Sequence, residues 1–353
     1  MKKVLLCAAA VIGVLALLIL VPTSPALLVD MPETIVTLPT GQVDEWGDPV
    51  GLPVTVYSVL IAAGAALAIV LTARLKTRRG GDFFSGMALA LTSGVCALFC
   101  SHLLFCVLRW SYIMNDLGGT AAFLVQFWQG GYTMYGAILG ALLGAVIYAC
   151  VKKEPVLSQL DVIVPGIAVM IIFGRLGEKF TLQGVGSYVA NEALYMLPFV
   201  SRTEWGTAQL SVYVYEALAA LAALVCSLIV LLRNRPVGRA AETGLAIISL
   251  MQVMLDSWRG DELIRFGFVR LNMICAAVTL AVILGTRVYR VAKQKGFDGW
   301  SIARTVMLLA GAGVVIAIEF ALDKSTINNT LLYALMTASL AVMGVAVLRE
   351  DGR

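Results

Sequence analysis

The sequence is short of charged residues and has a single histidine. Of its 353 residues, 14% are charged and 60% are hydrophobic, whereas soluble globular proteins average about 25% charged residues. This shortage excludes an ordinary soluble enzyme and an intrinsically disordered protein. The hydrophobic residues also gather into long runs without charge, which predicts that the lipid bilayer is the solvent of most of the chain.

The residue patterns that hold metals or cofactors are also missing. The seven cysteines all fall in apolar runs, and no two of them form a Cys-x-x-Cys pair. We interpret them as small packing residues, and we predict neither a metal nor an organic cofactor. The formal net charge of +4 is small and lies on one set of helix ends, so we expect no nucleic-acid partner.

Ten apolar runs predict an all-α fold, a polytopic integral membrane helix bundle of about ten membrane helices. Each run is long enough to enter a bilayer and is separated from the next by charged residues or by Gly and Pro. The predicted helices begin near Val4, Val54, Phe84, Gly131, Val162, Thr207, Thr243, Leu271, Thr305 and Leu331.

The basic residues predict how the chain crosses the membrane. Most of the 26 Lys and Arg residues fall on one set of helix ends, and the positive-inside rule assigns that set to the cytoplasm, together with both termini. The first helix has an alternative interpretation as a cleaved signal peptide, because Ser24-Pro25-Ala26 follows its apolar run. That run is 18 residues long, which exceeds the usual apolar region of about 7–15 residues and favours an uncleaved anchor.

Charged residues interrupt two outward-running helices early. Val162 to Gly174 and Thr243 to Leu255 are runs of 13 residues, or about 20 Å of helix against a hydrocarbon thickness of about 30 Å. Arg175, Asp256 and Arg259 are thereby expected at lipid-headgroup depth, with Glu216 in the intervening helix. Charges inside a membrane are costly and functional by default.

We interpret this set as the lining of a polar cavity that is open to the outer leaflet and holds an anionic headgroup. The fork of an arginine guanidinium matches phosphate oxygens in pairs. The alternative is a structural ion pair between an arginine and Asp256 or Glu216. Further candidates for the lining are the backbone at Gly131 and Gly136 and the side chains of His102, Gln183 and Gln252. For Gly136 and His102, helix packing is the favoured alternative.

Five sequence elements then occur in a characteristic order. They are Tyr57-Ser58, Gly-Gly-Tyr-Thr-Met-Tyr-Gly-Ala at 130–137, Asp161 to Gly186, Tyr215-Glu216-Ala217-Leu218 and Asp256-Ser257-Trp258-Arg259. Over Val54 to Leu284 the chain resembles the bacterial prolipoprotein diacylglyceryl transferase family. The family transfers a diacylglyceryl group from phosphatidylglycerol to the lipobox cysteine of a prolipoprotein. The resemblance implies these two substrates, the membrane lipids as surroundings and the bacterial cytoplasmic membrane as location.

The resemblance also implies roles for individual residues. Arg175 matches the motif arginine and is the best candidate to bind phosphate, Arg259 matches a second arginine, and Gly186 matches the glycine that ends the motif. Five family residues are replaced: a histidine by Tyr135, an asparagine by Glu178, a glutamate by Gln183, and two arginines by Gln252 and His102. Glu178, one turn from Arg175, is our candidate for the base that deprotonates the thiol.

The domain organisation follows from the same comparison. We predict an anchor helix and an acidic extracytoplasmic loop in 1–53, a transferase-like core in 54–288 with a small extracytoplasmic head segment at 178–206, and two additional membrane helices in 289–353. The replaced residues leave open a diverged, inactive relative that binds phospholipid or acts as an accessory protein. A transporter is disfavoured because the sequence shows no internal repeat.

Overall fold

The computed structural model describes residues 34–43, 49–115, 121–126, 131–181, 183–190, 195, 199–202, 207–233, 236–260, 264–296 and 299–349. The predicted first helix, and the choice between anchor and signal peptide, lie outside these residues. The chain forms two compact units. The first unit combines the residues up to Ala65 with Met170–Leu218 and Trp258–Asp261, and the second unit contains Ala66–Val169, Ala219–Ser257 and Glu262–Arg353.

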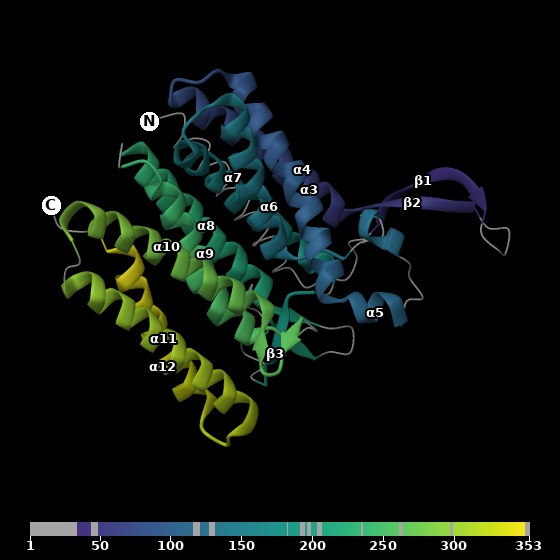
Figure 1. Cartoon of the computed structure of the whole chain (residues 1–353). Coiled ribbons are helices and arrows are strands. Elements are labelled where there is room, and N and C mark those ends of the chain that lie inside the picture. Colours follow the sequence, from purple (N-terminus) through teal and green to yellow (C-terminus); the bar gives the residue numbers. More distant parts are fainter. Residues whose placement is uncertain are drawn as a thin grey trace. The chain divides into compact units, whose positions relative to one another are not determined.

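Long helices make up most of the described chain (Figure 1). Eight helices in this part are long and apolar enough to cross a membrane, which confirms an all-α, polytopic membrane protein. The long helices are α3 (Val56–Arg78), α4 (Phe83–Leu108), α6 (Met134–Lys152), α7 (Val156–Gly177), α8 (Val212–Leu232), α9 (Arg239–Trp258), α10 (Leu271–Lys295), α11 (Gly299–Lys324) and α12 (Asn329–Leu348). Only α9 is not among the eight.

Close helix pairs in the second unit rest on small residues. α4 packs along α6, and α11 packs along α12. A Cβ at Gly136 would lie 2.7 Å from the Cα of Ser101, and one at Gly144 would lie 2.6 Å from the Cα of Ser93. The structure therefore places Gly136 in a helix contact, as the small-residue spacing indicates.

Two helices begin earlier than predicted. α7 starts at Val156 and has 22 residues, and α9 starts at Arg239 and has 20, so the expectation of two short helices is wrong. The reason is that Asp161 lies inside α7 with its charge satisfied. It accepts hydrogen bonds from the N–H groups of Gly238 at 2.8 Å and Ala241 at 2.9 Å, so it supplies partners for the N-terminal turn of α9.

Short elements that the sequence did not predict connect the helices. β1 (Thr34–Val43) and β2 (Pro49–Thr55) form an antiparallel hairpin within the predicted acidic loop. β3 (Val185–Tyr188), β4 (Val200–Arg202) and β5 (Ala208–Ser211) form an antiparallel sheet in the order β3-β5-β4 within the predicted head segment and just after it. Because β5 takes residues 208–211, α8 begins at Val212 and not near Thr207. The remaining elements are β6 (Arg265–Phe266), β7 (Val269–Arg270), α5 (Trp110–Asn115), η2 (Ala121–Val125) and η4 (Glu178–Thr181).

Candidate functional site

The first unit places four charged residues at helix ends. Arg175 lies in the last turn of α7, and Glu178 begins η4 directly after that helix. Glu216 lies four residues after the start of α8, and Arg259 comes directly after the end of α9. Three segments that are far apart in the sequence therefore each contribute charged side chains to the same site.

The four side chains form a network in which every cation contacts both anions. Arg175 contacts Glu178 through Nη1, and its Nε lies 3.3 Å from Oε2 of Glu216. Nη1 of Arg259 lies 2.8 Å from Oε2 of Glu216 and 3.2 Å from Oε2 of Glu178. We call these four residues the ion cluster.

The ion cluster is buried and electrically balanced. The exposed side-chain fractions are 10% for Arg175, 1% for Glu216, 3% for Arg259 and 12% for Glu178. Buried ion pairs are costly to desolvate and often stabilise a fold no better than apolar residues of the same size. Such a network in a membrane protein is therefore a candidate functional site. The sequence left open whether an arginine pairs with Asp256 or with Glu216. In the structure both Arg175 and Arg259 pair with Glu216, and both also contact Glu178.

A backbone contact holds Arg259 in place. Gly186 in β3 forms an antiparallel bridge with Arg259, and the N–H of Gly260 donates to the carbonyl of Val185 at 2.8 Å. A Cβ at Gly186 would lie 2.6 Å from the carbonyl oxygen of Trp258. Only glycine allows the strand to approach the end of α9 this closely.

We expect Gly186→Ala to destabilise the protein by about 1–3 kcal/mol, the usual cost of forcing extra volume into a packed site. The measurement is the midpoint of thermal unfolding in detergent. Gly174→Ala is the matched control, because a Cβ there would meet only Ile61 at 3.7 Å, and we expect no loss. A Gly186→Ala protein as stable as the parent would contradict the close contact.

Two close contacts, one with the ion cluster and one beside it, were missed from the sequence. Gly184 has a φ of +70°, and a Cβ there would collide with the Glu178 carboxylate. Tyr57 packs against the end of α7, because a Cβ at Gly177 would lie 2.6 Å from its ring. The glycines two residues apart at 184 and 186 were the available signal, since paired glycines mark close backbone approach. Gln183, just before them, is exposed.

Other predicted site residues belong to the second unit. Asp256 accepts a hydrogen bond from Nε2 of Gln252 at 2.7 Å and one from Nδ2 of Asn272 at 3.3 Å. The hydroxyl of Tyr135, which is buried, lies 3.5 Å from Oγ of Ser249. The structure therefore gives Asp256 amide partners within its own unit.

The histidine is surrounded by protein groups. His102 is buried, with Nδ1 3.1 Å from the carbonyl of Gly131 and Nε2 2.8 Å from that of Phe123. Its ring also stacks on Phe123, with the ring centroids 5.5 Å apart. These contacts fit the packing interpretation. Among the described residues, no group of three or more His, Cys, Asp or Glu side chains is placed to hold a metal ion.

Comparison with known proteins decides the family. The family model for prolipoprotein diacylglyceryl transferases matches residues 49–289, which is more than half of the chain.

The chain belongs to the prolipoprotein diacylglyceryl transferase family.

Individual relatives of this transferase agree with the family match and confirm the resemblance seen in the sequence. The phosphatidylglycerol–prolipoprotein diacylglyceryl transferase of Lysinibacillus sphaericus is 28% identical over 253 residues, 69% of this chain and 90% of that protein. The protein of the same name from Symbiobacterium thermophilum is 26% identical over 247 residues, with 67% and 90% covered. The one from Listeria innocua is 24% identical over 246 residues, with 67% and 86% covered. The chain is therefore a multi-pass membrane transferase of lipoprotein biosynthesis.

The family match covers only part of the structure. It includes all four residues of the ion cluster and ends at residue 289, within α10. α11 and α12 lie beyond it. The ion cluster thus belongs to the part of the transferase that it shares with its relatives.

Proposed function

We propose that this transferase moves the diacylglyceryl group of phosphatidylglycerol to the lipobox cysteine of a prolipoprotein, at the outer face of the bacterial cytoplasmic membrane. The observation that carries the proposal is the ion cluster, in which three residues at family motif positions, Arg175, Glu216 and Arg259, are in contact. In the reaction the thiolate sulfur forms a bond to the glyceryl carbon, the bond from that carbon to the phosphate oxygen breaks, and glycerol phosphate leaves.

The two arginines are suited to the phosphate. Both reach the same carboxylate oxygen, Oε2 of Glu216, at 3.3 and 2.8 Å, so a single phosphate group can contact both guanidinium groups. Bidentate guanidinium–phosphate contacts are strong and directional. They would also stabilise the negative charge that develops on the leaving phosphate.

Glu178 supplies the base in this proposal. It contacts both arginines and is the more exposed of the two carboxylates, at 12% against 1% for Glu216. Phosphate oxygens that take over the guanidinium N–H groups release the Glu178 carboxylate from its ion pairs. The released carboxylate accepts the proton of the substrate thiol, and the thiolate is the attacking species.

The remaining predicted site residues are proposed as substrate contacts. Tyr135, Gln252 and Asp256 are polar side chains buried in the second unit, and polar residues inside a membrane protein are candidates for a functional role by default. They, with His102, Gln183, Gly131, Gly136 and Gly186, are our candidates for contacts with the lipid or with the prolipoprotein segment. No cofactor is needed for the proposed transfer.

The membrane arrangement is proposed from the charge pattern. We propose about ten membrane helices, the first preceding the described residues, with both termini in the cytoplasm. The nine long helices of the described residues overlap nine of the ten predicted apolar runs. In this arrangement the ion cluster lies at the outer face, and the two added helices, α11 and α12, follow the transferase core.

We expect Glu178→Gln to lower the transfer rate by about 100- to 10,000-fold, the usual contribution of a general base. The measurement is lipidation of a purified reporter prolipoprotein in phosphatidylglycerol vesicles. Asp323→Asn makes the same carboxylate-to-amide change at an exposed position outside the ion cluster, and it should retain full activity. Transfer that survives Glu178→Gln would remove this residue from the role of base.

Complementation tests the proposed function as a whole. The chain is expressed in bacteria depleted of their own transferase, and thioether-lipidated prolipoprotein is measured by mass spectrometry. Lipidation supports the proposal, and its absence despite correct membrane insertion would contradict it. In that case, phosphatidylglycerol binding that is lost in Arg175→Ala would identify an inactive, lipid-binding relative.

A further inference from the structure

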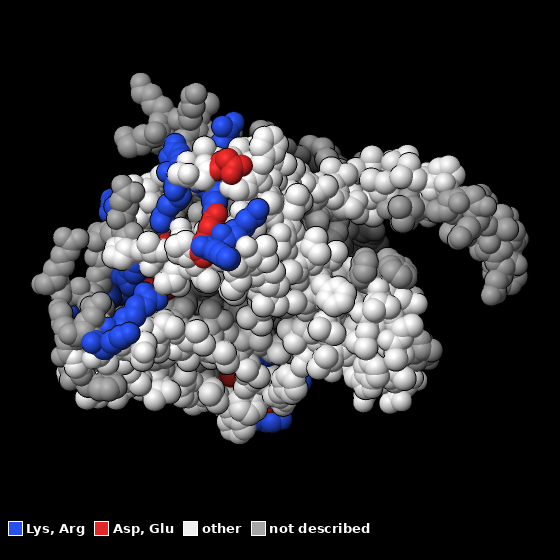
Figure 2. All heavy atoms as spheres, turned by 45° about the horizontal axis from the view of Figure 1, so that its top comes forward, with Lys and Arg blue, Asp and Glu red and all other residues white. Residues whose placement is uncertain are grey.

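Three arginines share one carboxylate at the ends of α9 and α10, in the second unit. Glu242 accepts hydrogen bonds from Nε of Arg287 at 2.8 Å and from Nη2 of Arg290 at 2.7 Å, and Nη1 of Arg239 lies 3.4 Å from it. Unlike the ion cluster, this group has three positive charges for one negative charge. On the face drawn in Figure 2, Lys and Arg side chains gather in patches, of which the upper one also contains acidic side chains and the one at the lower left is almost entirely basic.

Arg287 carries hydrogen-bond donors that its protein surroundings leave unused. The residue is 3% exposed, and its Nη1 and Nη2 make no hydrogen bond with any residue that the structure describes. Arg239 and Arg304 both interact with it electrostatically and have the same charge. Buried polar groups are nearly always hydrogen-bonded, so two guanidinium nitrogens without a hydrogen bond, beside arginines of like charge, point to a bound anion.

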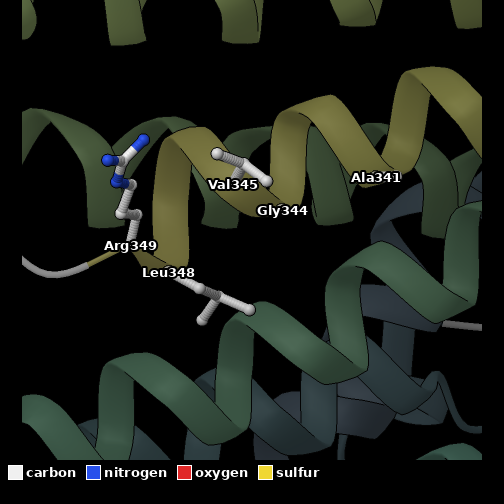
Figure 3. Close-up of a pocket in the computed structure, with 5 residues that line it drawn as sticks. All are labelled: Ala341, Gly344, Val345, Leu348 and Arg349. Atoms are coloured by element: carbon white, nitrogen blue, oxygen red, sulfur yellow. The ribbon is translucent and has the colours of Figure 1, made fainter.

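An apolar groove on α12 includes Arg349 in its lining (Figure 3). It has a volume of about 610 Å³ and is lined by Ala341, Gly344, Val345, Leu348 and Arg349. Nη2 of Arg304 donates to the carbonyl of Arg349 at 2.7 Å. The guanidinium groups of both residues lie over the ring of Trp300, 5.3 and 5.0 Å from its centroid. Arg304 therefore contacts Arg349 of the groove and also interacts electrostatically with Arg287.

We propose that Arg239, Arg287, Arg290 and Arg304 bind the phosphate of an anionic phospholipid, with an acyl chain in the α12 groove. Phosphate oxygens match the unused guanidinium donors, and basic pockets between membrane helices are typical sites for anionic headgroups. The charge pattern assigns these helix ends to the cytoplasmic leaflet, which is rich in anionic lipid. The groove lies on a helix beyond the family match, which ends at residue 289, and none of the four arginines belongs to the ion cluster, so this site does not depend on the proposed transfer reaction.

Lipid retention by the purified full-length chain tests the site. The protein is incubated in detergent with equal amounts of dioleoyl phosphatidic acid and dioleoyl phosphatidylcholine, and retained lipid is measured by native mass spectrometry. Phosphatidic acid is the probe because it is not the proposed diacylglyceryl donor. We expect preferential retention of phosphatidic acid, and a loss of about tenfold or more in Arg287→Gln, since a hydrogen bond to a charged group is worth at least that factor.

Two matched variants make the result specific. Lys293→Gln removes the same charge from an exposed position of α10, and retention should not change. Glu242→Gln removes the carboxylate that competes for the arginines, so retention should rise if the protein folds, an effect that a purely structural role does not predict. Arg290→Gln, which is more exposed, is the second loss variant if Arg287→Gln fails to fold.

Several results would overturn the proposed lipid site. Equal retention of phosphatidylcholine, or equal losses in Lys293→Gln and Arg287→Gln, would overturn the site. Inorganic phosphate that displaces all retained phosphatidic acid would show a free-anion site and overturn the lipid assignment. Retention of phosphatidic acid that disappears in Arg175→Ala would place the lipid in the ion cluster, and would also overturn the proposal. If the transfer reaction is not observed but retention behaves as expected, only the proposed function fails.

A further set of variants concerns acidic residues that lie outside the described residues. Asp298, Glu350 and Asp351 are close in sequence to Trp300 and Arg349 and lie outside the described residues. Unchanged or increased retention in their amide variants supports the lipid site. Retention that occurs only in these variants would show that an internal ion pair occupies the arginines, and would contradict the proposal.

Discussion

Replacing Arg175 by alanine is expected to lower the rate of diacylglyceryl transfer by at least about 100- to 1,000-fold, the usual effect of removing one donor that stabilises developing charge. The change also leaves Glu178 and Glu216 with a single arginine between them, because Arg175 contacts both carboxylates. The measurement is the initial rate of reporter lipidation in phosphatidylglycerol vesicles.

The comparison with Arg175→Lys separates charge from geometry. Lysine retains the positive charge but has no guanidinium fork, so it cannot reproduce the separate Nη1 and Nε contacts to Glu178 and Glu216. Relative to Arg175→Ala, we expect Arg175→Lys to recover more of the stability than of the transfer activity. Lys324→Ala, which removes a mostly exposed positive charge from α11, should leave transfer unchanged. An Arg175→Ala rate within tenfold of the parent would show that the ion cluster does not bind the phosphate.

The sequence predicts the charged residues better than their partners. Arg175, Glu216 and Arg259 stand out because charges are rare in apolar runs, and all three meet in the structure. Asp256 and Arg259 are one helical turn apart, which suggests a pair. However, α9 ends at Trp258 and the chain then pairs with β3. The sequence does not show this break, because it depends on a backbone contact with a distant glycine.

The predicted helix boundaries are wrong for a related reason. An apolar run is expected to end where a charge appears, yet Asp161 lies within α7 because two N–H groups of another segment satisfy it. The strands of the head sheet are three or four residues long, too short for alternating hydrophobicity to be recognised. The first error comes from partners that are far away in the sequence, and the second from the shortness of the strands.

Glu216→Gln is expected to destabilise the transferase by about 3–5 kcal/mol, the usual cost of removing one partner from a buried ion pair. Glu216 is 1% exposed and is contacted by both arginines, whereas Glu178 is 12% exposed. Burial thus divides the two carboxylates: Glu216 holds the arginines in place, and Glu178 is the one that phosphate can displace. The measurement is the thermal unfolding midpoint in detergent. A smaller loss is expected for Glu178→Gln, and the reverse order would contradict this division.

A charge-balanced double variant tests whether the cost comes from the unpaired charge. Glu216→Gln alone leaves two arginines for one carboxylate, and Arg259→Gln alone leaves two carboxylates for one arginine. The double variant retains the contact between Arg175 and Glu178 and has no net charge in the cluster. Its destabilisation should therefore be smaller than the sum of the two single losses by about 0.5–3 kcal/mol. Transfer should not return with stability, because the second phosphate contact is gone. Additive losses would mean that Glu216 and Arg259 contribute independently, and recovered transfer would mean that Arg175 alone suffices for the phosphate.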